Sequence, residues 1–190
     1  QVGEKISVIN AGDGIHAHPT QAMLDMYTIR KYKKEFDNLK VAIVGDILHS
    51  RVAKSLITSL TILSVKNINI IGPKILMPEN LNELHVEYFE SLEDGISGCD
   101  VVIMLRLQKE RMHEALISTD DYYKKYGLTS KKLQSASRDV IVMHPGPINR
   151  GIEIDSDVAD GNNSVILDQV TSGISIRMAI MSMIMNNRLK

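Results

Sequence analysis

The chain has 190 residues, enough to bury one substantial hydrophobic core, and its 22 basic and 23 acidic side chains leave a formal net charge of −1 at pH 7. A charge this close to zero argues against nucleic acid and against a membrane surface as partners, so a small-molecule ligand is expected. The single cysteine, Cys99, cannot form an internal disulfide and no stretch resembles a signal peptide, so we expect a cytoplasmic protein with a buried, inert thiol.

Short runs rich in Val and Ile alternate with helical patterns along most of the chain. The expected strands are KISVIN, KVAIVGD, NINIIGP, VEYF, DVVIMLRL and DVIVMHPGP, at 5–10, 40–46, 67–73, 86–89, 100–107 and 139–147. The expected helices lie at 20–36, 50–64, 79–85, 91–98 and 169–187, and the polar segment 108–137 is expected to be a mobile loop with one or two helical turns. This alternation predicts an α/β fold, a Rossmann-like parallel sheet with helices on both faces.

The glycine-rich loop INAGDGIHAHPTQ, at 9–21, leads into the first predicted helix. Pro19 suits the first helical position, and a helix start offers free backbone donors to a phosphate or carbonyl oxygen. His18 lies at this threshold and can donate to a developing oxyanion, while Gln21, about one turn further on, can bind an amide. The alternative is a capping loop with an incidental histidine, which is how we interpret His16.

Arginines follow two of the predicted strands. Arg51 comes soon after Gly45-Asp46, in a loop that lacks the G-x-G-x-x-G pattern, which argues against a nicotinamide dinucleotide. Arg106 and Gln108 are two residues apart and fall on one side of an extended chain. Since arginine suits a bidentate grip on a carboxylate, Arg51 and Arg106 indicate a substrate with two carboxylates. Solvated surface arginines are the alternative.

The last two features are a proline-rich turn and an apolar helix. Pro145, Gly146 and Pro147 form a rigid turn with few backbone donors, and its carbonyl oxygens can accept hydrogen bonds from a ligand NH2. His144 beside them is as well explained by a structural role.

The helix at 169–187 needs packing partners on more than one side, although its apolar run is too short to span a bilayer. Its apolar residues are Val170, Ile174, Ile176, Met178, Ile180, Met181, Met183, Ile184 and Met185.

Four segments together carry a resemblance to a known family. HPTQ, GDILHSRVA, LRLQKER and MHPGPINRG, in this order, resemble the aspartate carbamoyltransferase catalytic chain, in the half that binds L-aspartate and closes on carbamoyl phosphate. The similarity runs from about Asn10 to Asn186. It implies the aspartate/ornithine carbamoyltransferase fold, second domain only, and transfer of a carbamoyl group to L-aspartate, the committed step of pyrimidine biosynthesis. No metal or organic cofactor is implied.

The resemblance also implies residue roles. His18 binds the carbonyl oxygen of carbamoyl phosphate and is the catalytic residue, whereas Gln21 and the turn at Pro145, Gly146 and Pro147 hold its NH2. Arg51 binds the α-carboxylate of aspartate, and Arg106 with Gln108 binds the side-chain carboxylate. Ornithine carbamoyltransferases, which have a cysteine in the segment that matches HPGP, are disfavoured because two arginines repel the ammonium of ornithine.

A carbamoyl-phosphate domain is expected to precede this one. The chain opens on Gln1 rather than Met, and the phosphate-binding segment of the family is not among its residues, so we expect residues 1–190 to be the aspartate-binding domain, inactive alone. Helix 169–187 is then expected to pack on the amino-terminal domain, in full-length chains that form homotrimers and could associate with a dihydroorotase-like partner. The alternative is a noncatalytic carbamoyltransferase-like binding or assembly module.

Overall fold

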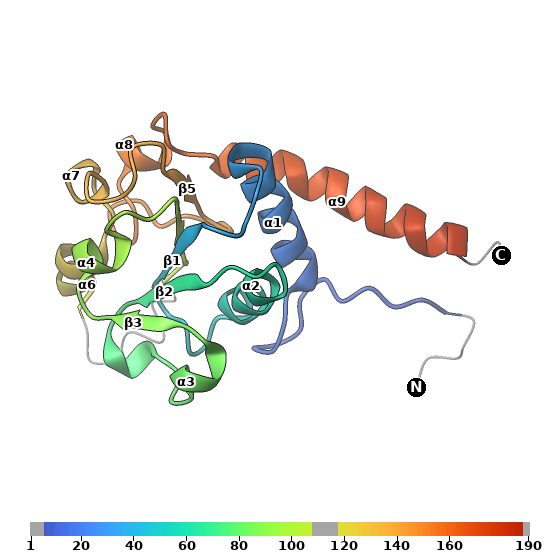
Figure 1. The fold of residues 1–190 in the computed structure, drawn as a ribbon, viewed down its shortest axis with the longest axis horizontal. Coiled ribbons are helices and arrows are strands. Elements are labelled where there is room, and N and C mark those ends of the chain that lie inside the picture. The colour runs from blue at the N-terminus through green and yellow to red at the C-terminus, as the bar shows by residue number, and fades with distance from the viewer. Residues whose placement is uncertain (1–5, 108–117, 188–190) are drawn as a thin grey trace.

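The computed structural model describes residues 6–107 and 118–187 (Figure 1). The strands are β1 Lys40–Val44, β2 Asn67–Ile71, β3 Glu87–Phe89, β4 Val101–Met104 and β5 Ile141–Met143. The helices are α1 Pro19–Lys33, α2 Arg51–Ile62, η1 Lys74–Leu76, α3 Leu81–Leu84, α4 Leu92–Ile96, α6 Thr119–Tyr126, α7 Ser130–Leu133, α8 Ser156–Ala159 and α9 Ile166–Asn187. Together they confirm the predicted α/β class.

All strand pairs in the sheet are parallel, in the order β3-β2-β1-β4-β5. From β1 the chain first builds outward through β2 and β3, then returns to the other side of β1 with β4. The crossover direction therefore reverses between β1 and β4. In open α/β sheets, the crevice outside the carboxyl ends of the strands at such a switch point is where ligands bind.

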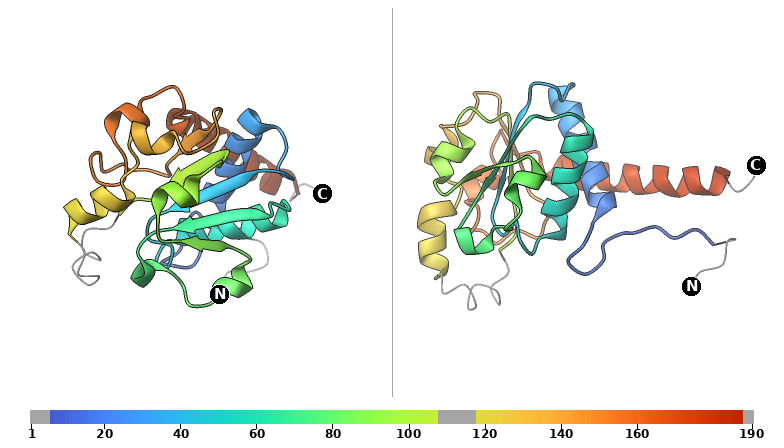
Figure 2. Two further views of the ribbon diagram at one scale, coloured as in Figure 1. Left: turned by 60° about the vertical axis from the view of Figure 1, so that its left-hand side comes forward. Right: turned by 60° about the horizontal axis from the view of Figure 1, so that its bottom comes forward.

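Two hydrophobic cores cover the two faces of the sheet. Alternation along β1 sends Val41 and Ile43 into the core beneath α1 and α2, and Ala42 and Val44 into the core beneath α4 and α6. Figure 2 shows α1 and α2 on one side of the sheet and α4 and α6 on the other. The predicted covering of both faces is confirmed, and it leaves the strand ends as the place for polar chemistry.

The prediction was wrong for two segments. The described part of the first predicted strand, 6–10, is exposed and irregular, because it runs outside the sheet and pairs with no described strand (Figure 1). Of the predicted loop at 108–137, residues 108–117 lie outside the described residues, and 118–137 is more regular than the predicted loop with one or two helical turns, because it forms α6 and α7. Tyr122 and Tyr126 of α6 are buried with ring centroids 5.3 Å apart, so an aromatic pair fixes this helix to the core.

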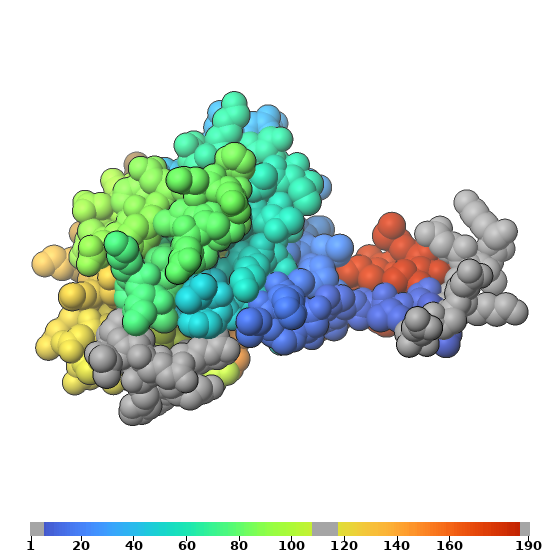
Figure 3. Space-filling view, turned by 90° about the horizontal axis from the view of Figure 1, so that it is seen from below, coloured from blue at the N-terminus to red at the C-terminus, as the bar shows by residue number. Residues whose placement is uncertain are grey.

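Helix α9 is anchored at its start and projects beyond the body of the molecule at its end (Figures 1 and 3). Near its start, Gln169 and Ser172 are buried and Asp168 pairs with Lys31 of α1 at 2.6 Å. Large apolar side chains along the helix remain exposed, namely Leu167, Val170, Ile174, Met178, Met181, Met183 and Met185. Within 6–107 and 118–187, no helix is both long enough and apolar enough to cross a membrane.

Candidate functional site

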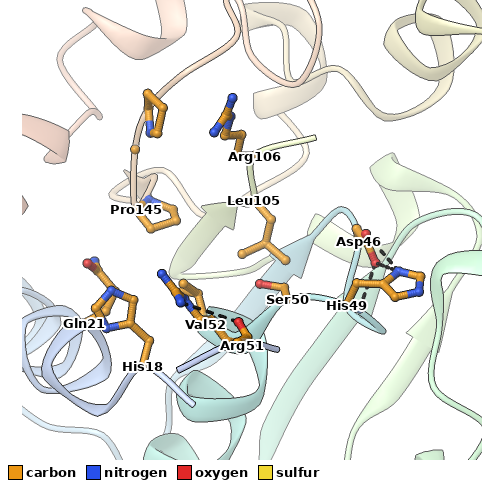
Figure 4. Close-up of a pocket in the computed structure, with 13 residues that line it drawn as sticks. His18, Gln21, Asp46, His49, Ser50, Arg51, Val52, Leu105, Arg106 and Pro145 are labelled. Atoms are coloured by element: carbon orange, nitrogen blue, oxygen red, sulfur yellow. Dashed lines mark hydrogen bonds and ion pairs between the residues drawn. The ribbon is translucent and has the colours of Figure 1, made fainter. Parts of the chain in front are cut away.

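A cavity of about 410 Å³ lies outside the carboxyl ends of β1, β4 and β5, at the switch point of the sheet (Figure 4). It is lined by Gly14, His18, Gln21, Asp46, His49, Ser50, Arg51, Val52, Leu105, Arg106, Pro145, Gly146 and Pro147. Segments far apart in the sequence thus converge on one space. Each of the four motifs singled out in the sequence contributes at least one side chain to it.

The loop before α1 is held by its own polar side chains. Asn10 accepts from the backbone N–H of Gly12 at 2.8 Å, and Asp13 accepts from that of Ala17 at 2.8 Å, which lowers the pKa of the Asp13 carboxyl. The backbone N–H of His18 then donates to the Ser55 hydroxyl of α2 at 2.9 Å. These bonds fix His18 at the N-cap of α1, directly before Pro19.

The His18 imidazole is set up to be neutral. Burial lowers its pKa below 6.5, and the cations of Arg51 and Arg177 lower it further. Its Nδ1 is buried and has no hydrogen-bond partner among the residues that the structure describes. A neutral ring with Nδ1 closed off can carry its proton on Nε2 and donate it to a ligand oxygen.

Gln21 presents an oxygen rather than an amide NH2 to the pocket. Its Nε2 donates to the carboxylate Oδ1 of Asp25, one turn further along α1, at 3.0 Å. Asp25 is fully buried, and this burial raises its pKa to about 7 against the opposing hydrogen bonds from Gln169 and Gln21 and the charge of Arg177. Because the NH2 of Gln21 is engaged, its free oxygen suits a ligand that donates a hydrogen bond.

Arg51 begins α2, and Ser50 caps that helix by accepting from the backbone N–H of Ala53 at 3.1 Å. The guanidinium turns back toward the opening loop, where Nη1 approaches the carbonyl of Gly14 at 3.5 Å. A Cβ on Gly12, whose φ is +121°, would lie 3.0 Å from Cζ of Arg51. A glycine at this position lets the loop pass directly beside the cation.

Arg106 follows β4 and lies on the opposite wall of the same pocket, exposed to solvent (Figure 4). Its backbone neighbour Leu105 donates from its N–H to the carbonyl of Val44 at 2.8 Å, which continues the pairing of β4 with β1 beyond the last strand residue. This pairing places the two arginines on one cavity. Gln108, the predicted partner of Arg106, lies outside the described residues.

The turn after β5 is organised by a buried histidine. Nδ1 of His144 accepts from the backbone N–H of Gly146 at 2.9 Å, so the ring hydrogen must be on Nε2, which faces Oε1 of Glu153 at 3.2 Å. The backbone N–H of Asn149 donates to the same carboxylate oxygen. His144 is therefore a structural residue that shapes the turn, with Gly146 at a φ of +71°.

The buried groups behind the pocket were not predicted from the sequence. Asp25, Gln169 and Glu153 support pocket residues from within the core, and Asp46 accepts from the backbone N–H of His49 at 3.0 Å. One signal was visible: Asp25 is four residues after Gln21 inside an apolar helical stretch. By contrast His16 is exposed and does not line the pocket, and the described residues hold no cluster of three metal-ligating side chains.

The site therefore combines three kinds of group. Two guanidinium groups suit carboxylates or phosphates, a neutral imidazole can stabilise a developing negative charge on oxygen, and a side-chain oxygen beside backbone carbonyls suits an NH2 group. The N-termini of α1 and α2 add a positive potential on the same side. Such a pocket fits a small anion that carries an amide.

Comparisons with known proteins point the same way. The family model described as the Asp/Orn binding domain of aspartate/ornithine carbamoyltransferase matches residues 37–184, and the model of the carbamoyl-P binding domain matches residues 1–31. Aspartate transcarbamoylase from Trypanosoma cruzi in complex with phosphate is 29% identical with a TM-score of 0.78, covering 90% of this chain and 58% of that chain. Its complex with N-(phosphonacetyl)-L-aspartic acid gives the same identity and TM-score, over 90% and 57%.

An ornithine enzyme is comparably similar. Ornithine carbamoyltransferase from Gloeobacter violaceus is 25% identical with a TM-score of 0.77, covering 92% of this chain and 60% of that chain. The chain thus spans less than two thirds of the length of each of these structures. Similarity of the whole fold does not separate the two substrate classes, so the choice between them depends on the pocket residues.

Proposed function

This chain belongs to the aspartate/ornithine carbamoyltransferase family, and we propose that it forms the amino-acid-binding half of an aspartate carbamoyltransferase. In the reaction, the α-amine of L-aspartate bonds to the carbonyl carbon of carbamoyl phosphate. The bond from that carbon to the bridging oxygen breaks, phosphate leaves with the electron pair, and the amine loses a proton. The products are N-carbamoyl-L-aspartate and phosphate, an early step in pyrimidine synthesis.

One observation carries this proposal: Arg51 and Arg106 line the same cavity as His18 and Gln21. In the proposed roles, His18 donates from Nε2 to the carbonyl oxygen as the negative charge develops there. The oxygen of Gln21 and the carbonyls of Pro145 and Gly146 accept from the carbamoyl NH2. Pro147 has no backbone N–H and so cannot place a competing donor beside them.

The preference for aspartate over ornithine rests on charge. Arg51 takes the α-carboxylate common to both amino acids, and Arg106, with Gln108, takes the side-chain carboxylate of aspartate. Ornithine would bring an ammonium to the same position, where Arg106 repels it. The segment HPGP at 144–147 supports the same choice, because it holds no cysteine, whereas the resemblance gives ornithine enzymes a cysteine in the matching segment.

The domain organisation is part of the proposal. An amino-terminal carbamoyl-phosphate domain would supply the remaining phosphate ligands, and the stretch 169–187 of α9 would pack against it. Support comes from the exposed apolar residues of this helix, such as Ile174 and Met178, which are 62% and 61% exposed. We extend the proposal to homotrimers of the full-length chain, and to a dihydroorotase-like partner on the family resemblance alone.

The test is reconstitution. The 190-residue chain, mixed with the carbamoyl-phosphate domain of a related enzyme, is assayed for carbamoyl-aspartate and for citrulline, the carbamoylated product of ornithine. Carbamoyl-aspartate formed only in the mixture, with little citrulline, supports the proposal. Citrulline as the main product overturns the aspartate assignment. Carbamoyl phosphate bound but neither product formed, with both domains folded, favours a noncatalytic carbamoyltransferase-like module.

A further inference from the structure

Two buried polar residues behind the pocket, Asp25 and Gln169, have no part in the reaction as described above. Asp25 is 0% exposed and Gln169 is 3% exposed. They lie on different helices, α1 and α9, and meet where these two helices pack together beneath the pocket. Buried polar groups of this kind are costly unless they are bonded, so their bonding pattern is informative.

A continuous chain of hydrogen bonds joins two walls of the pocket through these residues. The backbone N–H of His144 donates to Oε1 of Gln169 at 2.9 Å, and Nε2 of Gln169 donates to Oδ1 of Asp25 at 2.8 Å. The same Oδ1 accepts from Nε2 of Gln21 at 3.0 Å. The turn after β5 and the Gln21 side chain are thereby connected across 123 residues of sequence, from 21 to 144.

The polarity of this chain is fixed at one end. A backbone N–H can only donate, so the amide of Gln169 must turn its oxygen toward His144 and its NH2 toward Asp25. Oδ1 of Asp25 therefore accepts from Gln169. The same Oδ1 accepts a second hydrogen bond from the NH2 of Gln21, so the oxygen of Gln21 points toward the pocket and can accept from a ligand.

The arrangement holds in both protonation states of Asp25. Oδ1 already accepts two N–H bonds, whereas Oδ2 is buried without a hydrogen-bond partner among the described residues. A proton taken up by Asp25 therefore belongs on Oδ2, and Oδ1 remains an acceptor. Reversing the Gln21 amide would place its oxygen against Oδ1 and bury two facing acceptors.

We propose that Asp25 and Gln169 are positioning residues that hold the oxygen of Gln21 toward the pocket and so make the site select a ligand NH2 over a ligand oxygen. This inference rests on the proposed function, since it concerns the carbamoyl end of the same site. It adds the reason for the selectivity. The hydrogen bonds that begin at the backbone N–H of His144 fix the orientation of the Gln21 amide from within the core. Gln21 on its own could present either atom.

The experiment compares two stable ligands of the same shape that differ only at this group. Phosphonoacetamide carries an NH2 and phosphonoacetate carries an oxygen in its place. Both are titrated by NMR in the millimolar range into the 190-residue chain and into its Asp25→Leu, Asp25→Asn and Gln169→Leu variants. The measured quantity is the ratio of the two dissociation constants, and thermal unfolding of every variant is recorded alongside.

The expected ratios follow from the acceptor at position 25. Asp25→Leu removes it, and the preference for phosphonoacetamide falls about tenfold, the loss of one oriented hydrogen bond. Asp25→Asn keeps an oxygen in place of Oδ1, with its NH2 in the place of Oδ2, and retains the preference to within about twofold. Gln169→Leu releases Asp25 from one side and gives a smaller decrease, which keeps the test decisive if Asp25→Leu does not fold.

Failure of the two proposals is distinguishable. If the unaltered chain binds neither phosphonate, whether alone or mixed with the carbamoyl-phosphate domain of a related enzyme, the carbamoyl-phosphate site and the inference that rests on it both fail. If it binds phosphonoacetamide but the ratio is the same in Asp25→Leu and Gln169→Leu, the site stands and the positioning role is overturned. A ratio lost equally in Asp25→Asn and Asp25→Leu overturns it as well, because a retained acceptor should rescue the preference.

Discussion

His18 and Arg51 stand at the N-termini of two helices, α1 and α2, whose starts meet at one pocket, so that an imidazole and a guanidinium line the same space. The relationship is electrostatic as well as spatial. Burial first, and then the charge of Arg51, lowers the pKa of His18. The cation proposed to bind a substrate carboxylate thus also favours the neutral form of the proposed oxyanion donor.

The first prediction is a pH titration. The ring-proton NMR signal of His18 should report a pKa below 6.5, and Arg51→Ala should raise it because a nearby cation is removed. Arg150→Ala, which removes a guanidinium paired with Asp160, is the control and should leave the value unchanged. The pKa of His18 is lower in the folded chain than in the unfolded chain. His18 therefore contributes stability above pH 6.5, and this contribution is lost as the pH falls from 6.5 through the folded-state pKa. A pKa unmoved by Arg51→Ala would contradict the coupling.

A second prediction concerns the glycine beside Arg51. In Gly12→Ala the new Cβ would lie 3.0 Å from Cζ of the guanidinium, so the arginine must shift and aspartate affinity should decrease severalfold. Gly98→Ala is the matched control: φ there is +67°, but no atom lies within 4 Å of the added Cβ. Both variants should lose about 1 kcal/mol or more of stability from backbone strain. Only Gly12→Ala should also weaken binding, measured by isothermal titration of the reconstituted enzyme.

Features that depend on residues close together in the sequence could be predicted, whereas features that depend on contacts between distant residues could not. The strand pattern predicted the parallel sheet, the helix start at Pro19 predicted His18 and Gln21, and the strand ends predicted Arg51, Arg106 and the Pro145–Pro147 turn. The structure brings all of these residues except Pro19 to one cavity. Each of those predictions used only local spacing and the rule that parallel strands end at one edge. The segment 6–10 failed for the converse reason, since a strand needs a neighbour and Val and Ile content does not supply one.

The buried network lies beyond such reasoning. Asp25 and Gln169 are 144 residues apart and meet only because α9 returns to pack on α1. The spacing of four residues indicates that Gln21 can contact Asp25, but nothing in the local sequence indicates the contact from Gln169. Similarly, the pair His144–Glu153 depends on the path of the turn between them, so its role could not be read from the HPGP motif.

Asp25 gives the third prediction, a stability measurement across pH. Burial raises its pKa to about 7 from 3.8, so the folded chain holds a proton that the unfolded chain releases. Stability should therefore decrease as the pH rises from about 4 to about 7, by at most about 1.4 kcal/mol per unit from this group. Asp25→Asn cannot ionise and should be more stable than the unaltered chain at pH 8 but not at pH 4, in urea unfolding. Parallel curves of unfolding free energy against pH for the two proteins would contradict a raised pKa of Asp25 in the folded chain.

The fourth prediction addresses Arg106. In the reconstituted enzyme, Arg106→Ala should raise the Michaelis constant for aspartate and lower kcat, while carbamoyl phosphate affinity changes little. A charge-assisted contact to a carboxylate contributes about 1.5 to 3 kcal/mol, which corresponds to a loss of about tenfold or more. Arg106→Lys keeps the charge without the bidentate geometry and should recover part of the loss. His18→Ala, in contrast, should act mainly on kcat; a similar effect of both changes on both substrates would contradict these roles.

The last prediction concerns the exposed face of α9. Val170, Ile174 and Met178 recur at helical spacing and are 63%, 62% and 61% exposed, and burying each such side chain is worth roughly 1.5 to 3 kcal/mol. The 190-residue chain alone should therefore self-associate or bind the apolar dye ANS, and adding the carbamoyl-phosphate domain should suppress both.

The variant Ile174→Glu tests whether this face is responsible. It should decrease dye binding and self-association, because it places a charge in the middle of the apolar stripe. Ile62→Glu is the matched control, since Ile62 is 75% exposed on α2, outside α9, and its replacement should change neither property. Sedimentation of the unaltered chain as a monodisperse monomer that binds no dye at micromolar concentration would contradict the prediction. The apolar side chains of α9 would then be tolerated in water and would give this helix no physical reason to pack on a further domain.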